Sequence, residues 1–211
     1  MTRNEALKII LDSKVIAVIR MADSRKLFKV IEAVRRGGIR AVEITMTIPG
    51  AIDIIRALAV EKPEGALLGA GTVLDARSAD AVIKAGADFV VSPVLNLKMV
   101  RACRANDRFV APGAFSPTEI LTAWENGADV VKVFPATSLG PKFFKDIRGP
   151  LPHVRLMPTG GVNAENAKDF IEAGACCVAI GTALLDPKTI EQEDWDALAR
   201  KARELVDSLG D

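Results

Sequence analysis

The sequence predicts an α/β fold, a closed (β/α)8 (TIM) barrel, from three observations. Short apolar runs alternate with longer segments of helical period along all 211 residues. Eight such runs in a chain of this size favour a barrel over a doubly wound sheet. No GxGxxG loop follows the first run, which weakens the dinucleotide-binding alternative. We therefore predict a single domain over residues 1–211, with an extra N-terminal helix within residues 1–12.

Each apolar run is about one strand long and rich in β-branched residues. In chain order the runs are 15–20, 41–46, 66–72, 89–93, 109–113, 129–135, 154–160 and 177–182. Segments of helical period lie between them, among them 24–36, 51–61, 76–85, 117–126 and 164–173. The alternation of strand with helix predicts right-handed βαβ units and a parallel sheet.

A weak internal repeat marks the ends of the predicted helices. The segments 37–40, 85–88, 126–129 and 173–176 each contain a glycine between a helix and the next strand. Glycine past a helix end adopts the left-handed conformation that turns the chain toward the strand. After the last run, residues 190–209 predict one amphipathic terminal helix.

Composition argues against several classes of function. The net charge is only +1, from 28 basic and 27 acidic residues, and no basic run indicates a nucleic-acid partner. No stretch approaches the roughly 20 apolar residues of a membrane helix, and the N-terminus lacks a signal-peptide pattern. Three cysteines and one histidine form neither a disulfide set nor a zinc pattern. We predict a reduced, cytoplasmic protein with no metal, no cofactor and no membrane partner.

Strand parity directs two ionisable side chains into the predicted barrel interior. Glu43 and Thr47 share one face of the second run, opposite an apolar face that suits the helix layer. Lys132 and Phe134 share the corresponding face of the sixth run. A lysine in an apolar interior should have a lowered pKa, and a neutral amine is a nucleophile toward carbonyl groups. The alternative is a buried Lys–Glu ion pair that only holds the barrel together.

Glycine-rich motifs follow the seventh and eighth runs. Gly160 and Gly161 lie in Pro-Thr-Gly-Gly-Val, and Gly181 and Thr182 lie in Ile-Gly-Thr-Ala. Loops at these two places commonly bind phosphate in barrels, because backbone N–H groups there can approach phosphate oxygens. The sequence therefore predicts a phosphate site, against the alternative that these glycines only form tight turns.

Three further residues lie at the ends of predicted strands. Thr72 ends the third run, where its hydroxyl suits either a helix cap or a carboxylate or carbonyl group of a substrate. Arg20 ends the first run on its inward face, and it either binds an anion or forms a surface ion pair. Pro93 shapes the end of the fourth run, and we expect Phe134 to form a wall of the site.

Together these segments resemble the 2-keto-3-deoxy-6-phosphogluconate (KDPG) aldolase family. That family includes 4-hydroxy-2-oxoglutarate (KHG) and 2-dehydro-3-deoxy-6-phosphogalactonate aldolases. The resemblance covers about residues 14–185, through the motifs at 42–52, 69–75, 90–93, 111–119, 131–136 and 158–162. It implies a (β/α)8 barrel, a metal-free class I lyase mechanism through a Schiff base, a phosphorylated keto-acid substrate and a homotrimer.

By this resemblance, Lys132 is the Schiff-base lysine and Glu43 is the general acid and base. Thr72 corresponds to a residue that contacts the pyruvyl carboxylate. The phosphate-binding positions of the family fall on Gly160, Gly161 and Thr182. The sequence departs from the family at Thr47, where many members carry an arginine that binds the carboxylate. Arg20 resembles a strand-one arginine of other members and is the candidate to supply the missing charge.

The expected reaction is reversible cleavage of KDPG to pyruvate and glyceraldehyde 3-phosphate, with 4-hydroxy-2-oxoglutarate, which gives pyruvate and glyoxylate, as a further substrate. An alternative within the family is 2-dehydro-3-deoxy-6-phosphogalactonate aldolase. Outside it, a phosphate-binding barrel isomerase or synthase would share the glycine loops, and a non-catalytic oligomeric scaffold would need only the barrel. The sequence does not choose between the gluconate and galactonate epimers, because that choice depends on the geometry around C4.

Overall fold

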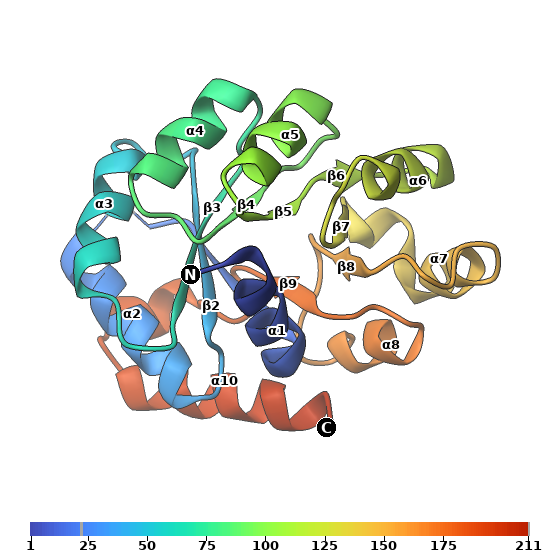
Figure 1. Ribbon diagram of the computed structural model, residues 1–211. Helices are drawn as coiled ribbons and strands as arrows, with labels where there is room; N and C mark the ends of the chain where they lie inside the picture. Colours follow the sequence, from blue (N-terminus) through green and yellow to red (C-terminus); the bar gives the residue numbers. More distant parts are fainter. Residues whose placement is uncertain (22, 211) are drawn as a thin grey trace.

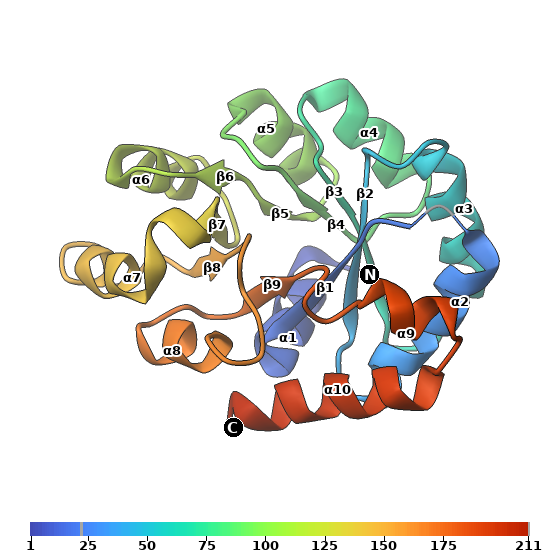
Figure 2. The ribbon, with the colours of Figure 1, turned by 180° about the vertical axis from the view of Figure 1, so that it is seen from behind.

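The computed structural model describes residues 1–21 and 23–210, which form a ring of short parallel strands surrounded by helices (Figures 1 and 2). The strands are β1 (Val15–Ile19), β2 (Ala41–Thr45), β3 (Leu67–Gly71), β4 (Phe89–Val91), β5 (Phe109–Ala111), β6 (Gly113–Ala114), β7 (Val131–Val133), β8 (Leu156–Pro158) and β9 (Val178–Ile180). The helices are α1 (Arg3–Ser13), α2 (Ser24–Arg36), α3 (Ala51–Glu61), α4 (Ala76–Lys84), α5 (Leu97–Ala105), α6 (Pro117–Glu125), α7 (Gly140–Arg148), α8 (Ala167–Glu172), α9 (Pro187–Glu191) and α10 (Trp195–Ser208), with a short 3₁₀ helix η1 (Ala136–Ser138).

Two sheets join into one barrel. Six strands are ordered β5-β4-β3-β2-β1-β9 and three are ordered β6-β7-β8. The chain itself connects β5 to β6, and a parallel bridge between Thr159 and Ala179 connects the end of β8 to β9. All the strand pairs are parallel, so the predicted (β/α)8 class is confirmed.

The fifth predicted run differs from the prediction, because it forms two strands instead of one. Pro112 separates β5 from β6 and has no N–H to donate to a ladder. Both neighbouring runs remain bonded on either side of it: Asp129 N–H donates to Val110 O before the proline, and Gly113 N–H donates to Val94 O after it. The proline interrupts only the regular ladders, which join the fifth run to β4 before it and to β7 after it.

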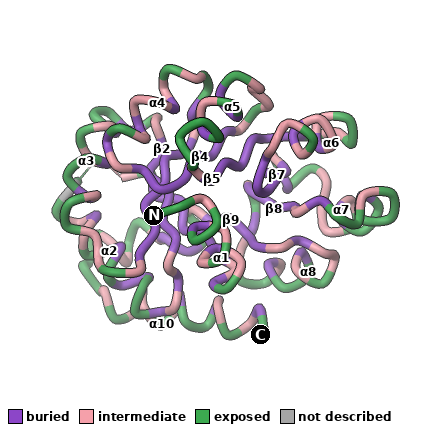
Figure 3. The backbone as a smooth tube through the Cα atoms, in the orientation of Figure 1, coloured by how far each residue is buried: buried purple, intermediate pink, exposed green. Residues whose placement is uncertain are grey.

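The two faces of each strand enter two separate apolar clusters, as the parity of the sequence predicted. Ile16 and Val18 lie in the barrel lumen, whereas Ala17 and Ile19 pack under the helices. In the sixth run Val130 lies in the lumen, while Val131 and Val133 face outward. Figure 3 shows the strands as the most continuously buried part of the chain. The lumen is therefore a packed core below the level of the site.

Helix α1 closes one end of the barrel. Ala6 and Ile10 are fully buried and belong to the lumen cluster, and α1 contacts β1, β2 and β5. The helix lies in front of the strands in Figure 1 and behind them in Figure 2. Arg3 also forms an ion pair with Asp129 at 3.2 Å, just before β7. Because this end is filled, the carboxyl ends of the strands form the open mouth.

The glycine repeat is explained by the turns into the strands. Gly86 and Gly127 have φ values of +106° and +95°, a conformation that glycine adopts without steric cost. The aspartates that follow use their carboxylates in the sheet. Asp88 accepts a hydrogen bond from Leu68 N–H at 3.0 Å, and Asp129 accepts one from Val110 N–H at 2.9 Å. Each pair fastens the start of one strand to its neighbour.

The predicted terminal helix over 190–209 is present as α10, but it begins only at residue 195, because a separate helix, α9, ends at residue 191. Glu193 has φ +55° between them, and Asp194 caps α10 by accepting from Ala197 N–H. The apolar stripe of α10 packs on α2 of the same chain, where a Cβ on Gly37 would lie 2.4 Å from Ala202 Cβ. Among the residues described, no helix has both the length and the apolar character to cross a membrane.

Helix α8 begins later than its sequence pattern indicates. The pattern predicted a helix from residue 164, but Asn163 and Asn166 accept hydrogen bonds from each other's backbone N–H, at 2.9 and 3.0 Å. Such side-chain bonds compete with helix formation and favour a turn. The loop after β8 is therefore longer than predicted, and α8 begins at Ala167.

Candidate active site

Glu43 and Lys132 extend into the lumen from opposite sides of the barrel. Around the ring, β1, β9 and β8 separate β2 from β7 on one side, and β3, β4 and the divided fifth run (β5 and β6) separate them on the other. Their side chains are almost completely enclosed, with only 1% of Glu43 and 5% of Lys132 exposed. Glu43 Oε2 accepts no hydrogen bond from any described residue. The acid and the amine predicted from the sequence thus lie in one interior, with a carboxylate oxygen left free for another partner.

The two residues form no ion pair in the described part of the chain, so the purely structural ion pair considered above is not observed. Lys132 Nζ instead lies 5.1 Å from the centre of the Phe134 ring. A cation near an aromatic face gains a modest electrostatic attraction.

Burial is the largest influence on both ionisable groups. It raises the pKa of Glu43, and the charges of Lys132 and Arg20 oppose that rise. It lowers the pKa of Lys132, and the charge of Arg20 lowers it further while Glu43 opposes the change. The lowered lysine pKa agrees with the expectation from the sequence. The pKa values of both groups are therefore shifted toward neutral pH relative to those of exposed residues.

Glycines on β3 make the room that Glu43 needs. A Cβ on Gly71 would lie 1.7 Å from Glu43 Oε1, and a Cβ on Gly69 would lie 2.2 Å from the Phe89 ring. Any side chain at position 71 would therefore displace the carboxylate. Sequence reasoning missed this role, although Gly-Ala-Gly places both glycines on the inward face of the third run.

The predicted phosphate residues surround one cavity of about 190 Å³ at the mouth. Its lining includes Arg20, Gly160, Gly161, Gly181 and Thr182. The tandem glycines at 160 and 161 have φ values of +87° and +74°, and a Cβ on the second would lie 1.8 Å from Thr137 Cγ2. Glycine is thus required there by both conformation and space.

Arg20 extends over the loop after β9. Its Nη1 atom lies 3.5 Å from the position that a Cβ on Gly181 would occupy. Arg20 is exposed and forms no ion pair with the residues described, so the surface ion pair considered for it is not observed. Its guanidinium is available to an anion in the cavity.

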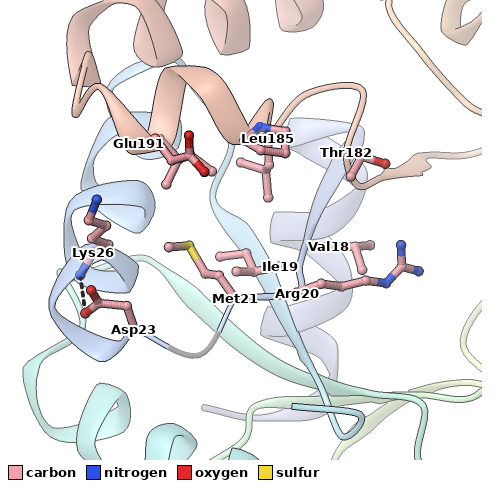
Figure 4. A pocket seen from close by; sticks show the side chains of 11 residues that line it. Val18, Ile19, Arg20, Met21, Asp23, Lys26, Thr182, Leu185 and Glu191 are labelled. Atoms are coloured by element: carbon pink, nitrogen blue, oxygen red, sulfur yellow. Dashed lines mark hydrogen bonds between the residues drawn. The ribbon is translucent and has the colours of Figure 1, made fainter.

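A second cavity of about 370 Å³ adjoins the first and shares Val18, Arg20 and Thr182 with it. Figure 4 shows Arg20 and Thr182 on one side, and Lys26 and Glu191 on the other. It lies between the end of β1, the start of α2 and α9. The sequence did not predict this space, because α9 had been assigned in part to a longer terminal helix.

Phe134 connects the lysine to the glycine cavity. Its ring lies beside Lys132 Nζ, and a Cβ on Gly160 would lie 3.3 Å from the same ring. Thr159 borders the same cavity, and its buried Oγ1 has no hydrogen-bond partner among the described residues. An unpaired buried hydroxyl is costly unless a ligand satisfies it. Sequence reasoning missed Thr159, although it lies in the Pro-Thr-Gly-Gly motif two residues after inward-facing Met157.

The remaining predicted residues lie at the rim. The parity argument was wrong for Thr47, because β2 ends at Thr45 and Thr47 is exposed in the following turn. The hydroxyls of Thr45 and Thr47 are nevertheless 2.9 Å apart. Thr72 has φ +58°, an uncommon conformation for a β-branched residue that often marks a functional position. Pro93 packs tightly, because a Cβ on Gly113 would lie 2.3 Å from its carbonyl oxygen.

Comparison with known proteins gives consistent matches. The family model for KDPG and KHG aldolases matches residues 7–201. A 2-dehydro-3-deoxy-phosphogluconate aldolase of Haemophilus influenzae is 32% identical over 99% of this chain and 98% of its own. A 2-dehydro-3-deoxy-6-phosphogalactonate aldolase of Escherichia coli is 32% identical over 80% of this chain and 83% of its own.

A solved structure has the same architecture. KDPG aldolase from Legionella pneumophila, with pyruvate captured at low pH as a covalent carbinolamine intermediate, aligns with a TM-score of 0.85. The two chains are 28% identical, and the alignment covers 94% of this chain and 97% of the other.

Replacing Glu43 with glutamine should lower the pKa of Lys132 further, because the carboxylate that favours the ammonium form is lost. Trace labelling with acetic anhydride over a range of pH, with acetylation of each lysine quantified by mass spectrometry, measures this pKa. Exposed Lys98 provides an internal reference for reagent reactivity. A Lys132 titration midpoint that is unchanged or higher in the variant would show that the two groups are not coupled.

Proposed function

The chain belongs to the KDPG and KHG aldolase family, and we propose that Lys132 forms its Schiff base while Glu43 transfers the protons. The protein is a lyase, a class I aldolase that reversibly cleaves KDPG to pyruvate and glyceraldehyde 3-phosphate. The observation that supports the residue roles is the convergence of a buried amine of lowered pKa and a buried carboxyl of raised pKa from opposite strands.

The reaction begins with neutral Lys132 attacking the C2 ketone of the substrate. The carbinolamine formed then loses water to give a protonated imine, with Glu43 supplying the proton that lets the oxygen leave. A carbinolamine of this kind was captured with pyruvate in the Legionella pneumophila relative. The apolar lumen favours the neutral amine that this first step requires.

Cleavage then uses the imine as an electron sink. Glu43, directly or through a water, removes the proton of the C4 hydroxyl, and the C3–C4 bond breaks as its electrons form the enamine. Glyceraldehyde 3-phosphate leaves, C3 of the enamine is protonated, and hydrolysis of the new imine releases pyruvate and free Lys132. A carboxyl group whose pKa is raised by burial can both accept and return this proton.

We place the rest of the substrate along Phe134 toward the glycine cavity. Arg20, Thr182 and the backbone N–H groups at 160, 161 and 181 bind the phosphate. We assign the hydroxyls of Thr72 and Thr47 to the pyruvyl carboxylate, Thr72 by its family position and Thr47 by its place at the end of β2. The unpaired hydroxyl of Thr159, between the lysine and the cavity, donates a hydrogen bond to a hydroxyl group in the middle of the substrate.

The galactonate epimer is the alternative substrate, and the Escherichia coli relative supports it. The 4-hydroxy-2-oxoglutarate reaction needs the same lysine and acid but no phosphate site, and the family match supports it as a second activity. Comparing kcat/KM for the three substrates with one enzyme preparation ranks them.

Incubation with pyruvate and borohydride should trap a stable pyruvyl adduct on Lys132, detected by mass spectrometry of the digested protein. Lys132→Ala should give no adduct and should lose roughly a thousandfold or more of its kcat, because the nucleophile is absent. The matched control is Lys98→Ala, which removes an exposed lysine and should leave both readings unchanged. An adduct on another lysine, or cleavage that persists in Lys132→Ala, would rule out this assignment.

Arg20→Gln should raise KM for KDPG by roughly 10- to 100-fold, the loss expected for a charge-assisted hydrogen bond. The KM for unphosphorylated 4-hydroxy-2-oxoglutarate should change much less, because that substrate has no phosphate. Arg25→Gln, a change at an exposed arginine on α2, is the control. Equal losses with both substrates would place Arg20 at the carboxylate instead.

We also propose that the protein is a cytoplasmic homotrimer. Cys103, Cys176 and Cys177 are free thiols, as expected in a reducing compartment. Leu74, Val94 and Phe115, on the loops after β3, β4 and β6, each expose 46–50% of their surface. Three apolar side chains on neighbouring loops form the kind of patch that interfaces cover.

Phe115→Glu should convert the trimer into monomers, because a charge would be buried in the interface. Light scattering coupled to size-exclusion chromatography gives the mass directly. Val60→Glu is the control, since Val60 is 84% exposed on α3, away from the mouth. A Phe115→Glu protein that stays trimeric would move the interface to another face.

A further inference from the structure

A cavity of about 540 Å³ lies on the outside of the barrel, beside the residues that precede β8 and β9. The ends of α7 and α8 and the segment 152–155 surround it, and Cys176 forms part of its lining. The two helices run next to each other there in Figures 1 and 2. Lys145, Arg148 and Arg155 contribute three cationic side chains, and Glu172 is the carboxylate among the lining residues. The cavity is therefore electropositive and separate from the mouth.

Two adjacent cysteines differ in access at this place. Cys176 is partly exposed and borders the cavity, whereas Cys177 is fully buried in the lumen cluster. Their sulfur atoms are 3.8 Å apart and share a hydrogen bond. The partly exposed cysteine thus borders the cavity, and the fully buried one lies directly beside its sulfur atom.

The surroundings favour the thiolate at Cys176 only. The hydrogen bond with Cys177 and the charge of Arg155 lower the pKa of Cys176 against the effect of burial. The pKa of Cys177 is raised by the same hydrogen bond and by burial. Burial and the carboxylates of Asp80 and Asp129 raise the pKa of Cys103 to about 12. Since the thiolate is the reactive form of cysteine, the three thiols should react at different rates.

We propose that Cys176 is a site of oxidation by hydrogen peroxide or small hydroperoxides, and that Cys177 converts the product into a disulfide between the two adjacent residues. The Cys176 thiolate attacks the terminal peroxide oxygen and the O–O bond breaks. The other oxygen leaves as hydroxide from hydrogen peroxide, or as alkoxide from a hydroperoxide, and is protonated to water or an alcohol. The resulting sulfenic acid is attacked by the Cys177 sulfur. The S–O bond then breaks, and the hydroxyl group leaves as water with the Cys177 proton.

This disulfide would be reversible rather than structural. The sulfur atoms need to approach from 3.8 Å to about 2.05 Å, and closing a ring between consecutive residues also requires the backbone to adjust. Neighbouring Cα atoms are only about 3.8 Å apart, less than the separation of about 4.4–6.8 Å found for most disulfides. A strained disulfide is reduced more readily than a relaxed one, so thiol reductants should restore the pair.

The test uses the intact protein, treated with hydrogen peroxide and then with N-ethylmaleimide under unfolding conditions. Cleavage after lysine places Cys176 and Cys177 together in residues 169–188 and Cys103 in residues 99–132. We expect peptide 169–188 to lose two hydrogen atoms and to regain them after dithiothreitol. Cys103 serves as the internal control and should be oxidised at least about tenfold more slowly, since it is buried and almost entirely a thiol.

Two variants separate the steps. In Cys177→Ser the sulfenic acid should persist and form an adduct with dimedone on Cys176. In Cys176→Ser peptide 169–188 should remain reduced, because the accessible thiol is missing. Circular dichroism checks that both variants fold. If Cys177→Ser does not fold, the results for the wild-type protein and for Cys176→Ser test the proposal. Oxidation of Cys103 as fast as Cys176, a disulfide between two chains, or no change in peptide 169–188 would overturn the proposal.

Discussion

The confinement of a carboxylate and an amine in an apolar lumen is the constraint on which the rest of the structure depends. Among the described residues, Glu43 Oε2 has no hydrogen-bond partner to replace the water lost on burial. Within the same part of the chain, Glu43 and Lys132 form no ion pair. Burying such groups costs free energy, and favourable packing elsewhere in the barrel has to offset that cost. The glycines of β3 belong to this arrangement, since they leave the space in which the carboxylate lies.

The same constraint links stability to pH. Because the folded-state pKa of Glu43 is raised, its contribution to stability is complete below the unfolded value and is lost as pH rises through the folded one. The folded-state pKa of Lys132 is lowered, so its contribution is present above the unfolded value and is lost as pH falls through the folded one. Between the folded-state pKa values of Glu43 and Lys132, the charged forms of both groups lower the free energy of unfolding. The attraction between the carboxylate and the ammonium group offsets part of that loss. A site suited to proton transfer is therefore also a local weakness of the fold.

The barrel is closed at one end and open at the other, and this arranges the functional residues in layers along its axis. Helix α1 fills the base with Ala6 and Ile10, and lumen side chains such as Phe89 and Phe109, whose rings meet edge to face, form a solid floor. Above that floor lie the charged pair, then Phe134 and Thr159, and finally the glycine cavity with Arg20. A ligand with a carbonyl group at one end and an anion at the other fits this vertical order. The outer cavity at Cys176 lies outside this order, on the helix-bearing surface.

By itself, the sequence determined the alternation of strand and helix, the inward placement of Glu43 and Lys132, and the glycine loops after the seventh and eighth runs. Those features depend on side-chain period and on glycine's backbone freedom, which are local properties. Only the tertiary structure decided that β2 and β7 face each other, that Arg20 extends over Gly181, and that Thr159 is left without a partner. It also decided the interruption of the fifth strand at Pro112, the position of Thr47 beyond the end of β2, and the break between α9 and α10. These features depend on how the barrel closes and on contacts between residues far apart in the chain, and no local pattern records such distances.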